Sequence, residues 1–308
     1  MNNYLLCVLG SSVDYFYAAD AYPVEGDFTH ARSLGSSIGG CPLNVGAVTA
    51  KKGIDVKALD MLGKEDESTS FILSELKRLN MDTDHVLIQS GVSNGKVLII
   101  NTSDQRTMFV IDPIRPYYVV DEKLQNTLNN ASYIYSLMHM INRSFETIEP
   151  LLEAKKQGAK VILDGSSKYD DPKRVETLYK LVDGLFINET DYERLKEHSI
   201  DDPRNIIFNN QGLFICVTQG SKGSTLYLKD EEIFMPSVKG LEVIDSTGAG
   251  DSFAGCFLAC LTKGYDYRKA LYYATLNGAY ACTVFGSTGG VCSFEALDEF
   301  AKKYHYGE

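Results

Sequence analysis

The stretch "DSTGAGDSFAGCFLACL" spans residues 245–261, packs small residues around two glycines and places Asp251 where an apolar run begins. A glycine-rich turn that opens a helix usually attracts an anion, because free backbone N–H groups and the positive end of the helix dipole converge there. A carboxylate at that position therefore needs a chemical reason.

Two common phosphate-binding turns do not fit this stretch. A dinucleotide-binding turn needs G-x-G-x-x-G early in a βαβ unit, whereas these glycines stand at 248, 250 and 255, near the C-terminal end. The P-loop pattern G-x-x-x-x-G-K-[ST] does not occur in the sequence. The turn is better interpreted as holding charge transiently: its backbone N–H groups would bind a transferring phosphoryl group while Asp251 accepts a proton from the attacking hydroxyl. A simpler alternative is that Asp251 only caps a helix.

Composition narrows the class of protein. The chain has 308 residues, 44% hydrophobic and 23% charged, with a net charge of −11. This charge argues against a nucleic-acid or membrane-surface partner bound by bulk electrostatics. The seven cysteines are odd in number and have no paired spacing, which disfavours a disulfide framework or a zinc site; Cys256 and Cys260 are expected to pack in the core. No secretion signal or membrane-spanning run stands out, so a reducing cytoplasm is the expected location.

Short apolar runs alternate with amphipathic stretches along most of the chain. This alternation is typical of repeated βαβ units, so we expect an α/β fold with a Rossmann-like, mostly parallel central sheet flanked by helices. The predicted strands are 4–10, 56–62, 132–137, 159–164, 184–188 and 213–218, and the predicted helices are 68–79, 144–158 and 171–182.

Two segments, about 13–38 and 92–112, break this rhythm. Both resemble antiparallel strands, and the second is predicted to be a hairpin with Lys96–Ile100 and Met108–Ile111 around "NTSDQR". We expect the two segments to meet as a small β-sheet lid over the main sheet. The chain is therefore predicted to be one domain, 1–308, with the lid inserted in it.

Two motifs carry a resemblance to a known family. "DSTGAGDSFAGCF" resembles the D-T-x-G-A-G-D-x-F-x-x-G signature of the ribokinase-like (PfkB) carbohydrate kinases, and "GGCPLNVGAVTAKKG" (39–53) resembles their G-G-x-x-x-N-x-A signature. The resemblance covers essentially the whole chain and implies the ribokinase-like fold, with ATP-dependent phosphorylation of a hydroxymethyl group on a small sugar. It assigns Asp251 as the catalytic base and Gly248, Ala249 and Gly250 as the anion hole.

The resemblance also implies sugar contacts. Asp14 would accept hydrogen bonds from sugar hydroxyls, Gly39 and Gly40 would allow close backbone approach, and Asn44 would offer a donor and an acceptor. Alternatively, Asp14 is a turn residue and Asn44 an ordinary residue of a helix start. "GGCPLN" is closer to the fructokinase and ketodeoxygluconate kinase forms than to the ribokinase form.

The nucleotide and cation contacts implied by the resemblance lie in the second half of the chain. "TQGSKG" (218–223) resembles the turn beside the ATP phosphates, and "NETD" (188–191) resembles an N-x-x-E motif that organises Mg²⁺ through water, with aspartate in place of glutamate. Adjacent Glu189 would either compensate or be solvated. The implied set is Asn188, Thr218, Gly220, Gly223 and Asn277 for ATP, Asp191 for Mg²⁺ and the backbone of Asp245 for K⁺.

Two alternatives for function and one prediction about assembly stay open. A nucleoside kinase of the same family is the nearest alternative, and a sugar-binding regulator without catalysis is another, which the intact turn and Asp251 disfavour. Val97–Ile100 are all apolar, so both faces of that lid strand carry hydrophobic side chains. We therefore expect a homodimer formed through the lid.

Overall fold

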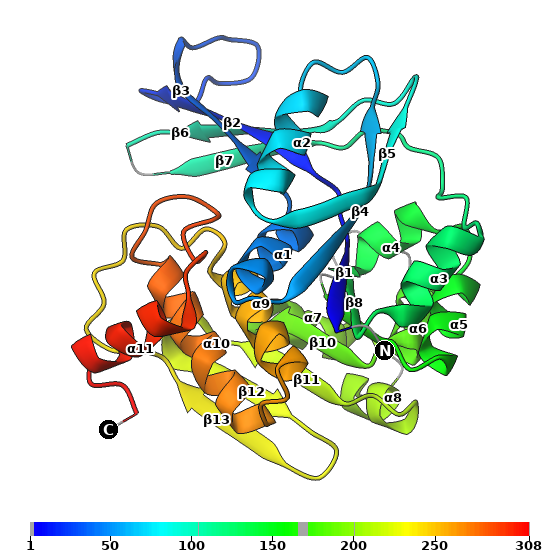
Figure 1. Ribbon diagram of the computed structural model, residues 1–308. Coiled ribbons are helices and arrows are strands. Elements are labelled where there is room, and N and C mark those ends of the chain that lie inside the picture. The colour runs from blue at the N-terminus through cyan, green and yellow to red at the C-terminus, as the bar shows by residue number, and fades with distance from the viewer. Residues whose placement is uncertain (1–2, 104, 166–171, 200, 308) are drawn as a thin grey trace.

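The computed structural model describes residues 3–103, 105–165, 172–199 and 201–307, and it contains two sheets (Figure 1). The larger sheet has nine strands in the order β13-β12-β11-β10-β9-β8-β1-β4-β5. Neighbours from β11 to β5 pair in parallel, whereas β12 and β13 pair antiparallel at one edge. The strands are β1 Tyr4–Val8, β4 Asp55–Gly63, β5 Met81–Gln89, β8 Tyr133–Leu137, β9 Lys160–Asp164, β10 Gly184–Asn188, β11 Phe214–Thr218, β12 Gly223–Tyr227 and β13 Glu232–Pro236.

Helices cover both faces of this sheet. One hydrophobic core lies under α1 Cys41–Lys51, α2 Thr69–Arg78, α9 Ala249–Thr262, α10 Tyr267–Ala281 and α11 Phe294–Lys303. The other lies under α3 Glu122–Asn130, α4 Met138–Ser144, α5 Glu149–Lys156, α6 Pro172–Leu181, α7 Glu189–His198 and α8 Pro203–Asn209. The sequence of β1 is continuously apolar because both faces of the strand are buried. Leu5 and Cys7 enter the first core, and Leu6 and Val8 enter the second.

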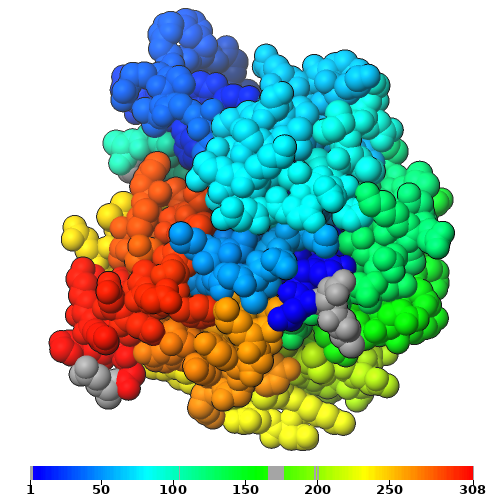
Figure 2. Space-filling model, viewed as in Figure 1, coloured from blue at the N-terminus to red at the C-terminus, as the bar shows by residue number. Residues whose placement is uncertain are grey.

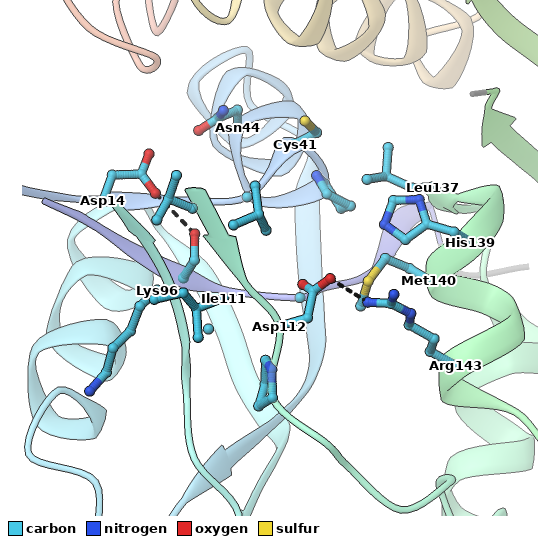
Figure 3. A pocket seen from close by; sticks show the side chains of 18 of the residues that line it. Asp14, Cys41, Asn44, Lys96, Ile111, Asp112, Leu137, His139, Met140 and Arg143 are labelled. Carbon is cyan, nitrogen blue, oxygen red and sulfur yellow. Dashed lines mark hydrogen bonds and ion pairs between the residues drawn. The ribbon is translucent and has the colours of Figure 1, made fainter. Parts of the chain in front are cut away.

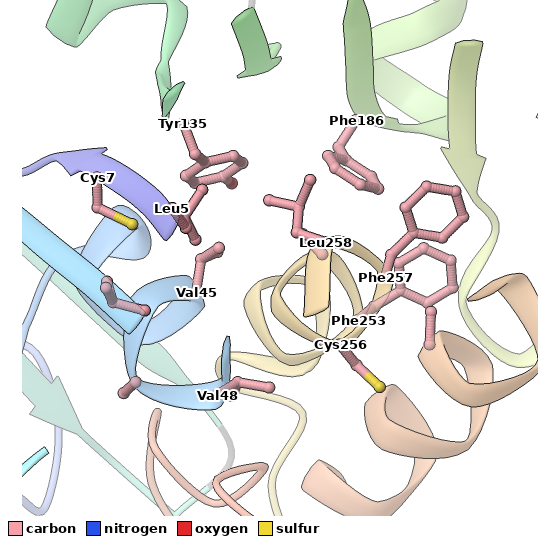
Figure 4. Close-up of a cluster of buried hydrophobic side chains, with 14 of the residues drawn as sticks. Leu5, Cys7, Val45, Val48, Tyr135, Phe186, Phe253, Cys256, Phe257 and Leu258 are labelled. Carbon is pink, nitrogen blue, oxygen red and sulfur yellow. The ribbon is translucent and has the colours of Figure 1, made fainter. Parts of the chain in front are cut away.

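Close packing of α1 against α9 places the two signature motifs together. A Cβ at Gly255 of α9 would lie 2.6 Å from the carbonyl oxygen of Val45 in α1, so only glycine allows this approach. Thr49 Oγ1 of α1 donates a hydrogen bond of 3.0 Å to the carbonyl oxygen of Gly255. On its other side α9 packs Phe253 and Phe257 around Phe186 of β10 (Figure 4). The first turns of α1 and α9 consequently meet at the carboxyl edge of the sheet.

The smaller sheet is the lid, a projecting lobe in Figure 2. Its strands, β2 Ser12–Ala19, β3 Ala31–Gly39, β6 Gly95–Asn101 and β7 Arg106–Ile111, follow the order β3-β2-β6-β7. The predicted β6–β7 hairpin is confirmed, but the pair that joins the two lid segments, β2 with β6, is parallel. Both strands enter the lid from the main sheet, with Ser12 opposite Gly95, which makes their directions the same.

The predicted mostly parallel sheet, its flanking helices and the small β-sheet lid are confirmed, as are the six predicted strands. Strands β5, β12 and β13 of the large sheet were not predicted, and the helix predicted over 144–158 begins only at Glu149. Pro150 explains this start, because proline lacks an N–H group and suits a first helical turn rather than a helix interior. Cys256 and Cys260 are buried in the core, as expected. Within the described ranges, no helix combines the length and the apolar character needed to cross a bilayer.

Candidate active site

A cavity of about 850 Å³ lies between the lid and the carboxyl edge of the large sheet. The start of α1, the start of α9 and the helix α4 form its body side, and β2, β6 and β7 form its lid side. Figure 3 shows Asp14 and Lys96 on the lid side and Cys41 and Asn44 on α1. The predicted sugar and phosphoryl residues Asp14, Gly40, Asn44, Gly248, Gly250 and Asp251 all line this cavity.

The turn before α9 has the geometry of an anion site. Gly248 stands at the N-cap with φ of 74°, and a Cβ there would lie 2.2 Å from the carbonyl oxygen of Ser287, so the position requires glycine. Gly250 is exposed, with open space beside it. The N–H group of Ala249 donates to the Ser246 carbonyl at 3.3 Å, so of the three anion-hole residues Ala249 is the one turned back into the loop.

Asp251 lies in the first turn of α9 and is held from α1. Asn44 Nδ2 donates to Asp251 Oδ2 at 2.7 Å, and the Cys41 thiol also hydrogen-bonds this carboxylate. Burial raises the pKa of Asp251 to about 6, and the two donors oppose that rise. Asn44 was expected to contact a sugar. In the structure its Nδ2 donates to Asp251, and its Oδ1 is buried without a hydrogen-bond partner among the described residues. A sugar contact of Asn44 stays a prediction.

Asp164 is a second carboxylate in this region, and sequence reasoning missed it. It ends β9, and Tyr135 Oη donates to its Oδ2 at 3.3 Å. Burial raises the pKa of Asp164 to about 7, with a further contribution from the charge of Asp251, which ionises first. The signal was present in "AKVILD", because a carboxylate at the carboxyl end of a parallel strand faces the ligand edge of the sheet.

Asp14 and its glycine neighbour form the lid side of the cavity. Asp14 sits on β2, where its Oδ1 accepts a hydrogen bond from Ser12 Oγ at 3.0 Å, and partial burial raises its pKa. A Cβ at Gly39 on the adjacent strand would lie 2.3 Å from Asp14 Oδ1. Gly39 therefore makes room for the Asp14 carboxylate, while Gly40 itself lines the cavity.

The far end of the cavity is closed by the segment that leaves the lid. Arg115 pairs with the fully buried Asp60 at 3.1 Å, and Arg143 of α4 pairs with Asp112 at 2.6 Å (Figure 3). His139 and Met140 of α4 lie beside the second pair. This end combines apolar and planar side chains with two ion pairs, a chemistry different from that of the end at Asp14.

The "NETD" motif forms a local cap at the start of α7. Asn188 Oδ1 accepts from the Asp191 N–H group at 2.9 Å, and Asn188 Nδ2 donates to Asp191 Oδ2 at 2.6 Å. Arg194 pairs with Asp191 Oδ1 at 3.0 Å. Glu189 is neither a substitute for Asp191 nor simply solvated, because it pairs with Lys222 and accepts from Gln219.

The remaining predicted nucleotide residues lie outside the lining of the cavity. Thr218 ends β11. Gly220 begins the short 3₁₀ turn η2 (Gly220–Lys222) and Gly223 follows it, at the same edge of the sheet. Asn277 is fully buried: its Nδ2 donates to Gly290 O at 2.9 Å, and its Oδ1 accepts from the Cys292 thiol. As placed, Asn277 shapes the loop after α10 rather than offering its amide to a ligand.

Asp245 joins two loops at this edge. Its Oδ1 accepts from the N–H group and hydroxyl of Thr247 at 2.9 and 2.6 Å, and its Oδ2 accepts from the Gly286 N–H group at 3.1 Å. From the lid, Arg106 Nη1 donates to the same Thr247 hydroxyl at 2.5 Å. Sequence reasoning did not single out Arg106.

Comparison with known proteins supports this architecture. Over 309 residues the chain is 25% identical to a nucleoside kinase of Methanocaldococcus jannaschii, covering 97% of each chain. Its fold is similar to that of Arabidopsis thaliana ribokinase, solved with ribose and ATP, with a TM-score of 0.84, 22% identity and coverage of 98% and 99%. It is also similar to a ribokinase II structure from E. coli in complex with ATP and Mg²⁺, with a TM-score of 0.78, 19% identity and coverage of 97% and 99%.

The family comparison is the most direct. The model of the pfkB family carbohydrate kinases matches residues 3–292, which include both signature motifs, the lid and Asp251. This match confirms the predicted ribokinase-like fold and a phosphotransferase acting on a sugar hydroxyl. The chain belongs to the pfkB family of carbohydrate kinases.

Proposed function

We propose that this chain is an ATP-dependent kinase that phosphorylates a hydroxymethyl group of a small sugar, with Asp251 as the general base. The observation that carries the proposal is the position of Asp251, one turn behind the Gly248 anion site and in the same cavity as Asp14. Phosphoryl transfer needs a base, an anion hole beside it and a group that holds the acceptor hydroxyl, and these three positions would supply them.

The chemistry follows from these positions. Asp251 takes the proton of the sugar hydroxyl as its oxygen bonds to the γ-phosphorus of ATP. The bond from that phosphorus to the β–γ bridging oxygen breaks, and ADP leaves. Negative charge on the transferring group would be held by the N–H groups at the start of α9, principally those of Gly248 and Gly250, and by the helix dipole. A carboxylate with a pKa of about 6 is ionised at neutral pH and is still basic enough to accept the proton.

The residues present fit a hard cation. After burial, the negative charges of Asp251 and Asp191 also raise the pKa of Asp164, and a divalent ion would relieve this repulsion. Within the described ranges no three carboxylate, histidine or thiol side chains gather closely enough to ligate a metal by themselves. We therefore infer that Asp191 and Asp164 hold Mg²⁺ through water, where it would neutralise charge on the ATP phosphates.

We infer that loops at the same edge of the sheet would bind a monovalent cation and the nucleotide. K⁺ would lie at the backbone of Asp245, whose side chain ties the two loops concerned. ATP would extend from α9 along the edge formed by Asn188, Thr218, Gly220 and Gly223, with the loop held by Asn277 beside the adenine.

A nucleoside is the second candidate acceptor. The cavity continues past Asp14 into an end lined by Met61, Tyr117, His139 and Met140, which offers flat and polarisable surface for a base. The similarity to a nucleoside kinase of M. jannaschii is consistent with this candidate.

We also propose one domain with an inserted lid, assembly as a homodimer through the lid, and a cytoplasmic location. Phe109 on β7 is 54% exposed, and Leu34 on β3 is 48% exposed, so the lid presents uncovered apolar surface. Val97 and Ile99 face the cavity instead, and Ile99 is 4% exposed, so they are unsuited to testing the dimer. The seven free thiols suit a reducing compartment.

An ADP-release screen tests the function. Purified protein is incubated with ATP, Mg²⁺ and a panel of sugars, sugar acids and nucleosides, with and without K⁺, and Asp251→Asn is the matched control. We expect release with at least one sugar and its loss in the control. Release with a nucleoside alone would favour the second candidate, and no release with any acceptor would indicate a binding protein without catalysis.

A further inference from the structure

One arginine at the far end of the cavity keeps two hydrogen-bond donors unused. Arg115 lines the cavity, and its Nη1 donates to Asp60 Oδ1 at 3.1 Å. Its Nε and Nη2 are buried and have no hydrogen-bond partner among the described residues. These two nitrogens share one edge of the planar guanidinium, so their N–H groups point the same way. The edge can therefore donate to two neighbouring acceptor atoms of a ligand.

The position of Arg115 is fixed through the start of the lid. Asp60 is fully buried on β4, and it accepts from the Ser11 N–H group at 3.2 Å as well as from Arg115. Ser11 directly precedes β2, whose Ser12 donates to Asp14. Adjacent residues thus join Arg115 to the carboxylate that is proposed to bind the sugar. A substituent on that sugar would lie beside Arg115.

The ion pairs at this end indicate the charge of such a substituent. Arg115 is paired with Asp60 and Arg143 with Asp112, so the four charges are already balanced. A carboxylate on the ligand would add a further negative charge to this set. A neutral group with two acceptors side by side would satisfy the free edge without that cost. The pairing therefore favours a neutral ring over the carboxylate of a sugar acid.

Flat and polarisable side chains surround the same end. Met61, Tyr117, His139 and Met140 line it, and Figure 3 shows His139 and Met140 on α4. Side chains of this kind pack against the faces of aromatic rings. A purine with an oxygen at C6 carries two acceptors, N7 and O6, on one edge, and a bidentate arginine suits that edge. Adenine has an amino group in place of O6, which would set a donor against a donor.

We propose that the acceptor is a 6-oxopurine nucleoside, with Arg115 Nε and Nη2 donating to N7 and O6 of the base while Asp14 binds the ribose. This inference rests on the proposed kinase function and names the base of its second candidate acceptor. The cavity of about 850 Å³ lies within the range of about 300–1,000 Å³ that is usual for ligand pockets. Free ribose would occupy only the end at Asp14.

The free edge of Arg115 is closed to solvent in the ligand-free protein, so this side chain must shift as the base binds. Its neighbours Ile114 and Pro116 are exposed, and Ile114 is 95% exposed. Little packing of these neighbours therefore opposes the shift.

ADP release with matched nucleosides tests the base contact. We expect kcat/KM of the parent to be roughly 10- to 100-fold higher for inosine than for adenosine, the discrimination of one bidentate base contact. For 7-deazainosine, which lacks N7, kcat/KM should be roughly tenfold lower than for inosine, because one buried N–H group stays unpaired. Equal use of inosine and adenosine, an undiminished rate with 7-deazainosine, or a preference for a sugar acid would overturn the inference.

Two variants assign the preference to Arg115. Arg115→Gln removes the charge, and Arg115→Lys keeps the charge beside Asp60 but has no planar fork. In both, kcat/KM for inosine should fall to within about threefold of that for adenosine, while kcat/KM for ribose stays within about threefold of the parent. The matched control is Arg78→Gln, which removes an exposed arginine of α2 and should keep the preference of the parent. A preference for inosine that survives in both Arg115 variants would overturn the inference.

Calorimetry without ATP separates this inference from the proposed function. The parent should bind inosine at least roughly tenfold more tightly than adenosine, and both Arg115 variants should lose this difference. If this result holds while no acceptor gives ADP release, the kinase function is wrong and the base contact stands. If only sugars without a base give ADP release, the kinase function stands and the inference is overturned.

Discussion

Replacing Asp164 by Asn should make the protein more stable and a poorer kinase. The folded state raises the pKa of this carboxyl from 3.8 to about 7, chiefly through burial and then through the charge of Asp251. A folded pKa above the unfolded one means that the folded state binds the proton more tightly. Its stability therefore falls as pH rises from about 4 to about 7 and stays low above that. Asparagine removes the ionisation and so removes this loss.

The magnitude follows from the size of the shift. A rise of about three pKa units corresponds to about 4 kcal/mol at pH 8, at 1.36 kcal/mol for each unit. Asp164 is partly exposed and asparagine still buries a polar group, so we expect a gain of about 2 kcal/mol. The gain should be larger at pH 8 than at pH 5, and it should shrink when Mg²⁺ and ATP neutralise the parent carboxylate.

Urea unfolding of the ligand-free protein at pH 5 and pH 8 measures this effect. Asp230→Asn is the control, because it removes one negative charge from an exposed residue at the β12–β13 turn. The same Asp164→Asn protein should need more Mg²⁺ for half-maximal ADP release. A variant less stable than the parent at pH 8, or a gain of equal size at both pH values, would refute the reasoning.

Three further expectations concern the base and the lid. Asp251→Asn should lower kcat by roughly 10²- to 10⁴-fold while calorimetry shows unchanged nucleotide affinity, since it removes a positioned general base. Because Asp251 must be ionised to accept a proton, kcat/KM of the parent should fall as pH drops below about 6. In Asn44→Ala this fall in kcat/KM should begin at higher pH, because the variant lacks the 2.7 Å hydrogen bond that stabilises the ionised Asp251. A fall at the same pH as in the parent would contradict this. Phe109→Lys should convert a lid dimer to monomer in light scattering, while Asp230→Asn, at the β12–β13 turn outside the lid, leaves it intact; a monomeric parent would end that proposal.

The large sheet and the catalytic turn were predictable because their determinants are local. Strands such as β1 and β11 are buried on both faces, so each appears in the sequence as a continuous apolar run that is easy to recognise. The turn before α9 needs glycine at 248, and Asp251 stands in the first turn of the helix, so both features are visible within a few residues. The helix predicted over 144–158 began too early because the spacing of its apolar residues continues across Pro150, whereas α5 begins just before that proline.

Contacts between distant segments were not predictable in the same way. Asn44 and Asp251 meet because Gly255 lets α1 approach α9, a contact across more than 200 residues that neither segment reveals alone. The parallel pairing of β2 with β6 depends on where both strands leave the main sheet, not on their alternation. Arg106 stands next to a polar turn, where an arginine is ordinary, and only the position of the hairpin over α9 distinguishes it.

The distribution of charge bears on how a polyphosphate could bind in the cavity. The chain is acidic, with a net charge of −11. Asp14 lines the lid side of the cavity and Asp251 its body side, and Asp164 lies close enough to Asp251 for that charge to raise its pKa. Without ligands this cavity disfavours the ionised forms of its own carboxyls, which is why Asp164 and Asp251 have raised pKa values. A polyphosphate can enter only with cations to offset this repulsion. A divalent ion held as proposed above would supply part of this charge, together with the N–H groups at the start of α9.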